Sequence, residues 1–128
     1  MAVLGVGVDA VEIARIRTAV GRTPSLLQRL YTGAELAACS NGDGVLRHEG
    51  LAGRFAAKEA VAKAFGTGIR GFGWRDVEVV SDIVGRPSVR LHEAAAAVAA
   101  RLGVESVHLS LTHTRELAIA QVVLEGGR

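Results

Sequence analysis

The sequence predicts an α+β fold in which helices pack on an antiparallel sheet. A long alanine-rich helix is expected in the middle of the chain, from about Val45 to Phe65. Residues 2–9 alternate as a strand, and residues 107–112 and 117–124 form two apolar strands joined by a short turn. So short a connection favours an antiparallel hairpin, and a final strand that is apolar on both faces is expected to be central. We treat residues 1–128 as a single domain, long enough for a substantial core.

The central helix carries charged residues in two different settings. Lys58 falls in the middle of its apolar face, whereas Glu59 and Lys63 lie together on the shoulder, one turn apart. Gly66 follows the last apolar residue, where a C-cap glycine is expected. These residues need no function if the stem of Lys58 is buried with its ammonium in water. Likewise, Glu59 and Lys63 can form an ordinary ion pair at the surface. The helix alone leaves both interpretations open.

The first strand ends in an acidic residue beside two glycines. Gly5, Gly7 and Asp9 share one face, and glycines in a strand allow a backbone or a ligand to approach closely. Asp9 is therefore a candidate site residue at the end of the strand. The alternative is that Asp9 caps the short helix expected over residues 12–20. No dinucleotide-binding or phosphate-loop motif is present.

The remaining elements follow from turn and capping signals. Thr32 and Glu35 form a capping box for a helix over residues 33–38. The other expected elements are a helix from Pro24 to about Tyr31, a loop at 41–44, a glycine-rich loop at 67–73, a hairpin of strands 76–81 and 88–91, and a helix over 93–102 ended by Gly103.

Composition limits the classes of function. The net charge is only +2 although the pI is about 9.2, which is too mild for a nucleic-acid binder but leaves room for a local basic face toward an acidic partner. The single cysteine, Cys39, excludes an internal disulfide and favours a reducing compartment. The sequence shows no apolar run of membrane-spanning length and no secretory signal. We therefore expect a cytoplasmic protein that contacts neither membrane nor nucleic acid.

Five residues are candidates for chemistry: Asp9, Lys58, Glu59, Lys63 and His113. No Cys/His cluster has zinc spacing, and no nucleophile elbow surrounds Ser110 and His113. Two carboxylates are what proteins usually supply to Mg²⁺, which completes its shell with waters and phosphate oxygens. Lysines beside them would neutralise the same phosphates. The residues point to phosphate chemistry.

Three separated segments together resemble a known family. They are Gly7-Val8-Asp9 with Arg15, Arg54-Phe55-Ala56-Ala57-Lys58-Glu59-Ala60 continuing through Lys63-Ala64-Phe65-Gly66-Thr67-Gly68, and Ser110-Leu111-Thr112-His113-Thr114. The chain resembles the holo-acyl-carrier-protein synthases, the short class of 4′-phosphopantetheinyl transferases, from residue 4 to about 125. It departs from the family at Ala10, where a larger aliphatic residue is usual, and at Thr112, which keeps the hydroxyl of the usual serine.

This resemblance implies a reaction and an assembly. Coenzyme A and an apo acyl carrier protein give the holo carrier protein and adenosine 3′,5′-bisphosphate, when the carrier's serine attacks the β-phosphorus of the CoA diphosphate. Asp9 and Glu59 would hold Mg²⁺, and either Glu59 or a metal-bound water would take the serine proton. The implied fold is α+β, assembled as a homotrimer.

The resemblance also assigns contacts. Lys63 would act in catalysis by pairing with the diphosphate, and Lys58 would support it as a further residue that binds CoA. Arg54, Thr112 and His113 would contact CoA, and Arg86 and Pro87 would reach its nucleotide end. Arg15 and Arg22 would face the carrier. Two other functions remain: a homologue that binds CoA without catalysis, and a structural oligomer that does not bind it. The identity of the carrier, from fatty-acid or polyketide synthesis, is left open, as is tolerance of acylated CoA.

Overall fold

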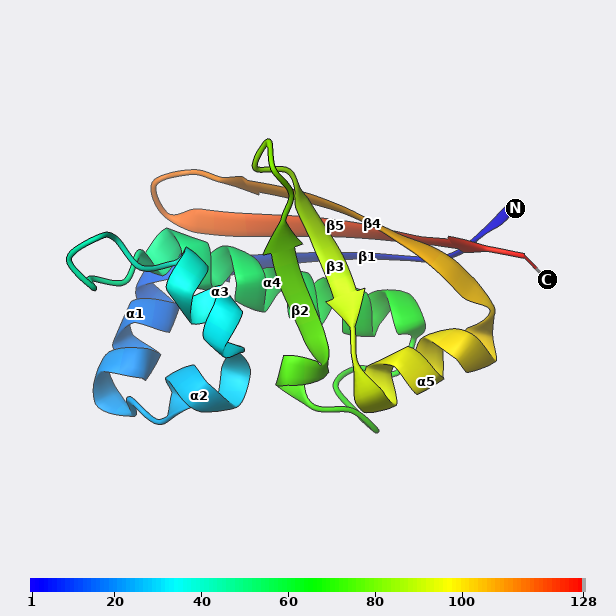
Figure 1. The fold of residues 1–128 in the computed structure, drawn as a ribbon, viewed down its shortest axis with the longest axis horizontal. Helices are drawn as coiled ribbons and strands as arrows, with labels where there is room; N and C mark the ends of the chain where they lie inside the picture. The colour runs from blue at the N-terminus through cyan, green and yellow to red at the C-terminus, as the bar shows by residue number, and fades with distance from the viewer. Residues whose placement is uncertain (128) are drawn as a thin grey trace.

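The computed structural model describes residues 1–127 and has the expected mixture of helices and antiparallel strands (Figure 1). In chain order the elements are β1 (Ala2–Glu12), α1 (Ile13–Arg22), α2 (Leu26–Leu30), α3 (Gly33–Ala38), α4 (His48–Phe65), the 3-10 turn η1 (Trp74–Asp76), β2 (Val77–Ser81), β3 (Pro87–Leu91), α5 (Glu93–Leu102), β4 (Val104–His113) and β5 (Leu117–Gly126).

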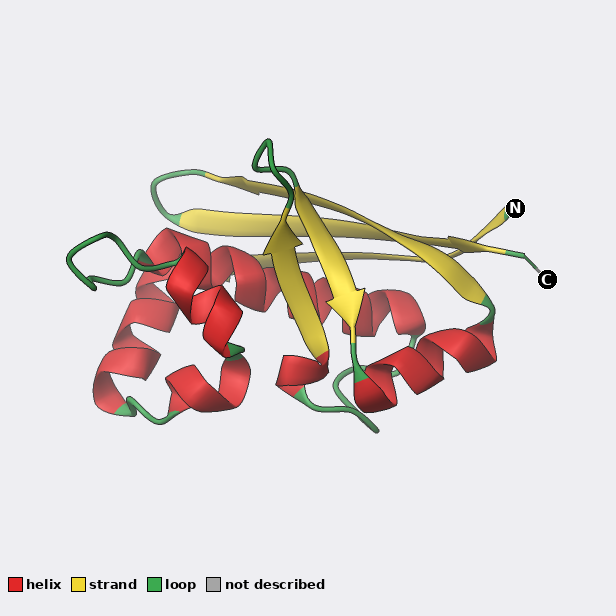
Figure 2. Ribbon diagram, viewed as in Figure 1, coloured by secondary structure: helices red, strands yellow, loops and turns green. Residues whose placement is uncertain are grey.

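The main sheet is antiparallel, with strand order β1-β5-β4, and β2 and β3 form a separate hairpin. The prediction that the last strand is central is confirmed. Figure 2 shows the helices gathered on one side of this sheet. Its other side is open, and Val6 and Val8 on β1 are 63% and 57% exposed there. Monomeric proteins rarely leave such aliphatic side chains together on an uncovered sheet face.

Helix α4 is the element around which the chain folds. It packs against all three strands of the main sheet on one side and against β2, α1 and α5 elsewhere. Alanines fill much of this contact, and Ala52, Ala56, Ala57 and Ala60 are fully buried. Small side chains allow the neighbouring elements to approach α4 from every side, so the helix is buried nearly all round.

The glycines of β1 bring that strand against α4. A Cβ atom on Gly5 would lie 2.2 Å from the carbonyl oxygen of Ala64, and one on Gly7 would lie 2.0 Å from that of Ala60. No side chain fits at either position. The close approach expected from these glycines is confirmed, and its partner is the backbone of α4. Asp9 lies two residues further along the same face of β1.

Several element boundaries differ from the sequence prediction, and two of them concern the candidate site. β1 continues through Asp9, which pairs with Ala120 of β5, and the ladder extends to Glu12 opposite Leu117. Asp9 therefore neither ends the strand nor caps α1, whose N-cap residue is Glu12. Helix α4 begins at His48 and not near Val45.

Other local predictions are confirmed. Thr32 and Glu35 form the capping box of α3, and Gly66 ends α4 with φ of +82°, a conformation that glycine adopts readily. The hairpin of β2 and β3 and the helix α5 lie where expected. Within residues 1–127, no helix is both long and apolar enough to cross a membrane.

Candidate active site

Asp9, Glu59, Lys63 and Arg15 come together at the β1 edge of the sheet. The Lys63 Nζ atom lies 2.9 Å from Asp9 Oδ1 and donates to the Val8 carbonyl oxygen at 3.0 Å. Glu59 lies one turn before Lys63 on α4, close enough to Asp9 for their charges to interact. We call Asp9, Glu59 and Lys63 the carboxylate half-site, and Arg15 of α1 lies beside it. The sequence-predicted pair of carboxylates thus lies in one place, although Asp9 and Glu59 are far apart in the sequence.

The carboxylate half-site disfavours the charged form of Glu59. Partial burial raises the pKa of the Glu59 carboxyl above its ordinary value, and the neighbouring Asp9 carboxylate raises it further. Lys63 and Arg15 oppose the shift. Two carboxylates held together in this way are a donor set suited to a cation. The described residues contain no cluster of three or more acidic, histidine or cysteine side chains, so a cation here would keep open positions for other ligands.

The raised pKa predicts how Glu59 affects stability. The free energy that Glu59 contributes to folding is present below the pKa of an unfolded carboxyl, about 4.3, and is lost as the pH rises through the raised folded pKa. We expect Glu59→Gln to increase the free energy of unfolding of the metal-free protein at neutral pH, with the difference vanishing toward pH about 4. Urea denaturation across this range measures it, with Glu116→Gln in the exposed β4–β5 turn as control. A Glu59→Gln variant less stable than wild type at neutral pH would contradict the expectation.

A pocket of about 190 Å³ lies at the opposite, β4 edge of the sheet. Arg54 of α4 and Thr112 and His113 of β4, the residues that the resemblance assigns to CoA, line it together with Arg47, Glu49, Gly50, Gly53 and Leu111. We call Arg54, Thr112 and His113 with this pocket the arginine half-site. Gly50 is close-packed, since a Cβ atom there would lie 3.0 Å from Cys39 Sγ. The packing explains a glycine inside a helix.

Only part of the Arg54 guanidinium forms hydrogen bonds within the protein. One of its terminal nitrogens donates to the Gly50 carbonyl oxygen at 3.3 Å, but the buried Nε atom has no hydrogen-bond partner among the described residues. Buried polar nitrogens nearly always have a partner, so an unpaired one beside a pocket indicates a place for an anionic or hydrogen-bond-accepting group.

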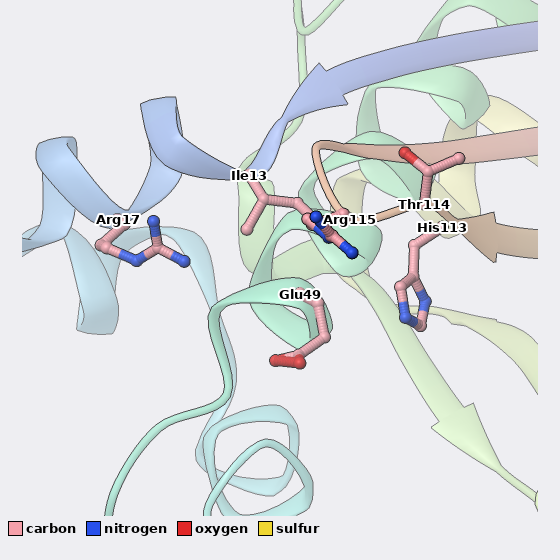
Figure 3. A pocket seen from close by; sticks show the side chains of 6 residues that line it. All are labelled: Ile13, Arg17, Glu49, His113, Thr114 and Arg115. Atoms are coloured by element: carbon pink, nitrogen blue, oxygen red, sulfur yellow. The ribbon is translucent and has the colours of Figure 1, made fainter.

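A second hollow, of about 430 Å³, adjoins the first and shares Glu49 and His113 with it (Figure 3). Arg17 and Arg115 reach toward this hollow from α1 and from the β4–β5 turn, while Ile13 lies between them (Figure 3). Sequence reasoning assigned no role to Arg17, Arg47 or Arg115. Arg47 precedes Arg54 by two helical turns, and this spacing could have shown that the two side chains lie on the same side of the helix. Nothing in the sequence links Arg17 to Arg115.

The two half-sites lie on opposite edges of the sheet. Asp9 on β1 and Leu111 on β4 both pair with Ala120 of the central strand, so two strand spacings, about 10 Å, separate the edges. On α4, Glu59 follows Arg54 by five residues, which turns it roughly 140° around the helix. The structure therefore brings Asp9, Glu59 and Lys63 together, and Arg54, Thr112 and His113 together, but keeps the two groups apart.

The expected contact of Lys58 with CoA is corrected by the structure. Lys58 and Glu35 are fully buried, and the Lys58 Nζ atom lies 2.8 Å from Glu35 Oε1. Burial lowers the pKa of Lys58, and the Glu35 carboxylate opposes that shift. The ammonium points into the protein, so Lys58 neither meets a ligand nor reaches water. The interpretation that it snorkels to the surface is wrong for the same reason.

The other predicted contact residues lie at the surface. Arg86 and Pro87 lie at the tip of the β2–β3 hairpin, where Asp82 accepts hydrogen bonds from the backbone of Val84 and Arg86. They do not line the pocket of the arginine half-site. Arg15 and Arg22 lie on one face of α1 beside a shallow hollow, and Arg15 is also the residue of α1 that reaches the carboxylate half-site.

Comparison with known proteins identifies the family. Residues 5–122 match the model of the 4′-phosphopantetheinyl transferase superfamily. The chain belongs to this superfamily. It is 50% identical over 125 residues to the holo-[acyl-carrier-protein] synthase of Frankia casuarinae, covering 98% of this chain and 99% of the relative. It is 45% identical to the same enzyme of Clostridium novyi over 123 residues, 96% of this chain and 88% of the relative.

Solved structures confirm the fold of this transferase. A holo-(acyl-carrier-protein) synthase from Bacillus anthracis str. Ames, crystallised in complex with CoA (3′,5′-ADP), aligns with a TM-score of 0.78 and 35% identity, covering 98% of each chain. The predicted family, the predicted α+β class and the prediction that the chain is an enzyme are therefore confirmed.

Proposed function

We propose that this transferase moves the 4′-phosphopantetheine group from coenzyme A to a serine of an apo acyl carrier protein, with Mg²⁺ as its metal and adenosine 3′,5′-bisphosphate as the second product. The observation that carries the proposal is the carboxylate half-site, in which Asp9, Glu59 and Lys63 from two distant segments meet. The family match and the CoA complex of the B. anthracis relative support the choice of substrate.

The donor chemistry of the carboxylate half-site fits Mg²⁺. Asp9 and Glu59 supply two carboxylates, and the described residues offer no further acidic ligand, as suits an ion that binds substrate phosphates as well. When bound, Mg²⁺ stabilises the negative charge of the diphosphate during transfer. Lys63 is half exposed, so its ammonium can leave Asp9 and bind a phosphate oxygen once CoA is present. Asp9 is then free to bind the metal.

The arginine half-site is assigned to the nucleotide end of CoA. Its guanidinium and imidazole groups suit phosphate, and the unpaired Arg54 Nε needs an acceptor. Pockets that enclose a whole ligand usually measure 300–1,000 Å³. The 190 Å³ around Arg54 and His113 is too small for the whole of CoA, which must extend beyond it. Arg86 and Pro87 are assigned to the part of the nucleotide outside the pocket.

A homotrimer would bring the two half-sites together. Since they lie on opposite edges of the sheet, a cyclic head-to-tail assembly can set the β1 edge of one subunit against the β4 edge of the next. Each junction would then hold one complete site. The open sheet face supports the same assembly, because a neighbouring subunit would cover Val6 and Val8. It would also cover Ile119 and Val123 of β5, which pair with residues of β1. Cys39, the single cysteine, suits the reducing cytoplasm in which we place the reaction.

The exposed face of α1 is assigned to the acidic carrier, and this gives a test. We expect Arg15→Glu to raise the KM for the carrier and to leave CoA binding unchanged, because opposed charges govern encounter and register. The defect should shrink as salt rises, since screening removes the wild-type advantage. Steady-state kinetics at several salt concentrations measure it, and Arg101→Glu on the distant α5 makes the same change of charge as a control. Loss of CoA affinity with unchanged carrier kinetics would show that Arg15 belongs to the CoA site.

Mass spectrometry of carrier proteins tests the function directly. The enzyme is mixed with CoA, Mg²⁺ and a panel of apo carriers, and each carrier is weighed before and after. We expect a gain of one phosphopantetheine group on at least one carrier, lost when Mg²⁺ is chelated. A protein that binds CoA but modifies no carrier would be a binding module. Absence of both binding and transfer would leave only a structural role.

A further inference from the structure

A buried ion pair lies on the side of α4 away from the carboxylate half-site. Besides Glu35, the Lys58 ammonium has two backbone acceptors, the carbonyl oxygens of Trp74 at 3.1 Å and of Val77. A lysine ammonium has three donors, and all three are used. The Lys58 side chain therefore joins the middle of α4 to η1 and to the first residue of β2.

Glu35 extends this connection. Its Oε1 atom accepts from the Thr32 backbone at 2.9 Å, and its Oε2 atom accepts from the Val79 backbone at 2.9 Å. The carboxylate thus holds both the start of α3 and the middle of β2. Lys58 and Glu35 together bind the backbone of β2 at Val77 and Val79, two positions along one edge of the strand.

Folding does not by itself require such a pair. Taking two charges out of water is costly, and apolar residues of similar volume in place of a buried pair are often neutral or stabilising. Removing one partner alone is harmful, because the other charge is left buried and unpaired. The elements that the pair connects indicate a more specific role.

Two of the connected elements, α4 and β2, lead to residues assigned to the nucleotide end of CoA. Arg54 lies one turn before Lys58 on α4, close enough for the two charges to interact. Strand β2 leads into the turn that carries Arg86, and Pro87 begins β3 directly after it. The pair therefore lies between the two groups that must hold one ligand.

We propose that Lys58 and Glu35 are positioning residues for coenzyme A: the pair fixes the β2–β3 hairpin against α4, so that Arg54 and the Arg86–Pro87 tip hold the same nucleotide. The proposal rests on the proposed function. It replaces direct contact between Lys58 and CoA with an effect transmitted through β2. The pair acts on CoA binding and not on the carrier, because the face of α1 that bears Arg15 and Arg22 lies on another element.

A double variant separates positioning from stability. In Lys58→Met with Glu35→Gln, neither charge of the pair remains, and the amide oxygen at position 35 can still accept from the backbone of Thr32 or Val79. We expect this variant to melt well above the single variant Lys58→Met. We also expect it to bind CoA and adenosine 3′,5′-bisphosphate more weakly by roughly tenfold to a hundredfold, a loss that displacement of about 1 Å can cause. Calorimetric titration with adenosine 3′,5′-bisphosphate measures this without catalysis.

Kinetics and a control complete the experiment. Partial unfolding would lower the apparent kcat through a smaller folded fraction, whereas lost positioning raises the KM for CoA and leaves the KM for the carrier unchanged. His92→Gln changes another side-chain contact of β2, in which His92 Nε2 lies 2.9 Å from Glu78 Oε1. This control should bind CoA as wild type does.

The outcomes distinguish the two proposals. A wild-type protein that neither binds CoA nor modifies a carrier overturns the proposed function. An active wild type with a folded double variant of equal CoA affinity overturns the positioning role, as does an equal loss of CoA affinity in His92→Gln.

Discussion

Replacing either Asp9 or Glu59 with alanine is expected to abolish transfer while leaving the fold intact. These are the carboxylates of the proposed metal site, and loss of metal-borne charge stabilisation costs several kcal/mol, roughly a thousandfold or more in rate. The fold should survive because Glu59 is held in an unfavourable charged state and Asp9 lies at the rim of the core. Carrier modification at saturating CoA measures the rate, and circular dichroism checks the fold.

The control for this prediction is Glu116→Ala, which removes an exposed carboxylate from the β4–β5 turn. It should retain wild-type turnover. A second measurement does not depend on activity: with CoA present, added Mg²⁺ should raise the melting temperature of wild type further and should not do so for either variant. Near-normal turnover by Asp9→Ala or Glu59→Ala at saturating Mg²⁺ would show that the metal is held elsewhere.

Two inactive variants should restore activity to each other if neighbouring subunits share each site. Asp9→Ala damages the carboxylate half-site, and His113→Ala damages the arginine half-site. In a mixed trimer, some junctions combine the intact half of one subunit with the intact half of another. Unfolding the two variants together and refolding them should therefore recover a sizeable fraction of wild-type activity, measured against each variant refolded alone.

A mixture with both lesions in the same half-site is the matched control. Asp9→Ala refolded with Glu59→Ala gives no junction with an intact carboxylate half-site, so it should stay inactive. Light scattering and native mass spectrometry establish that the mixed trimers form. A monomeric protein, or confirmed mixed trimers no more active than their parents, would mean that one chain builds the whole site.

Local patterns were sufficient to predict most elements. The capping box at Thr32, the C-cap at Gly66 and the turn between β2 and β3 all depend on residues close together in the sequence. The end of β1 was misjudged because the strand continues to Glu12 through its pairing with β5, a contact between the two ends of the chain that local propensity does not describe.

Lys58 shows where periodicity stops being informative. The helical wheel correctly placed Lys58 among apolar residues, but it could not reveal Glu35 as a partner 23 residues earlier. The pairing depends on how α3 and β2 pack on α4. Asp9 and Glu59 were recognisable as a pair from their chemistry and from the family resemblance, whereas the separation of the two half-sites became visible only from the strand order.

The burial of α4 also determines how this helix can change without harm. Between Leu51 and Phe65, the polar residues that reach the surface are Arg54, Glu59 and Lys63, each assigned to a half-site, and Phe55 is the only other residue not buried there. Nearly every remaining position touches another element, so a larger side chain meets a neighbour and a smaller one leaves a cavity. The helix therefore has almost no positions at which a substitution would be neutral, and we expect substitutions to be tolerated more readily at the exposed positions of the other elements and in the loops.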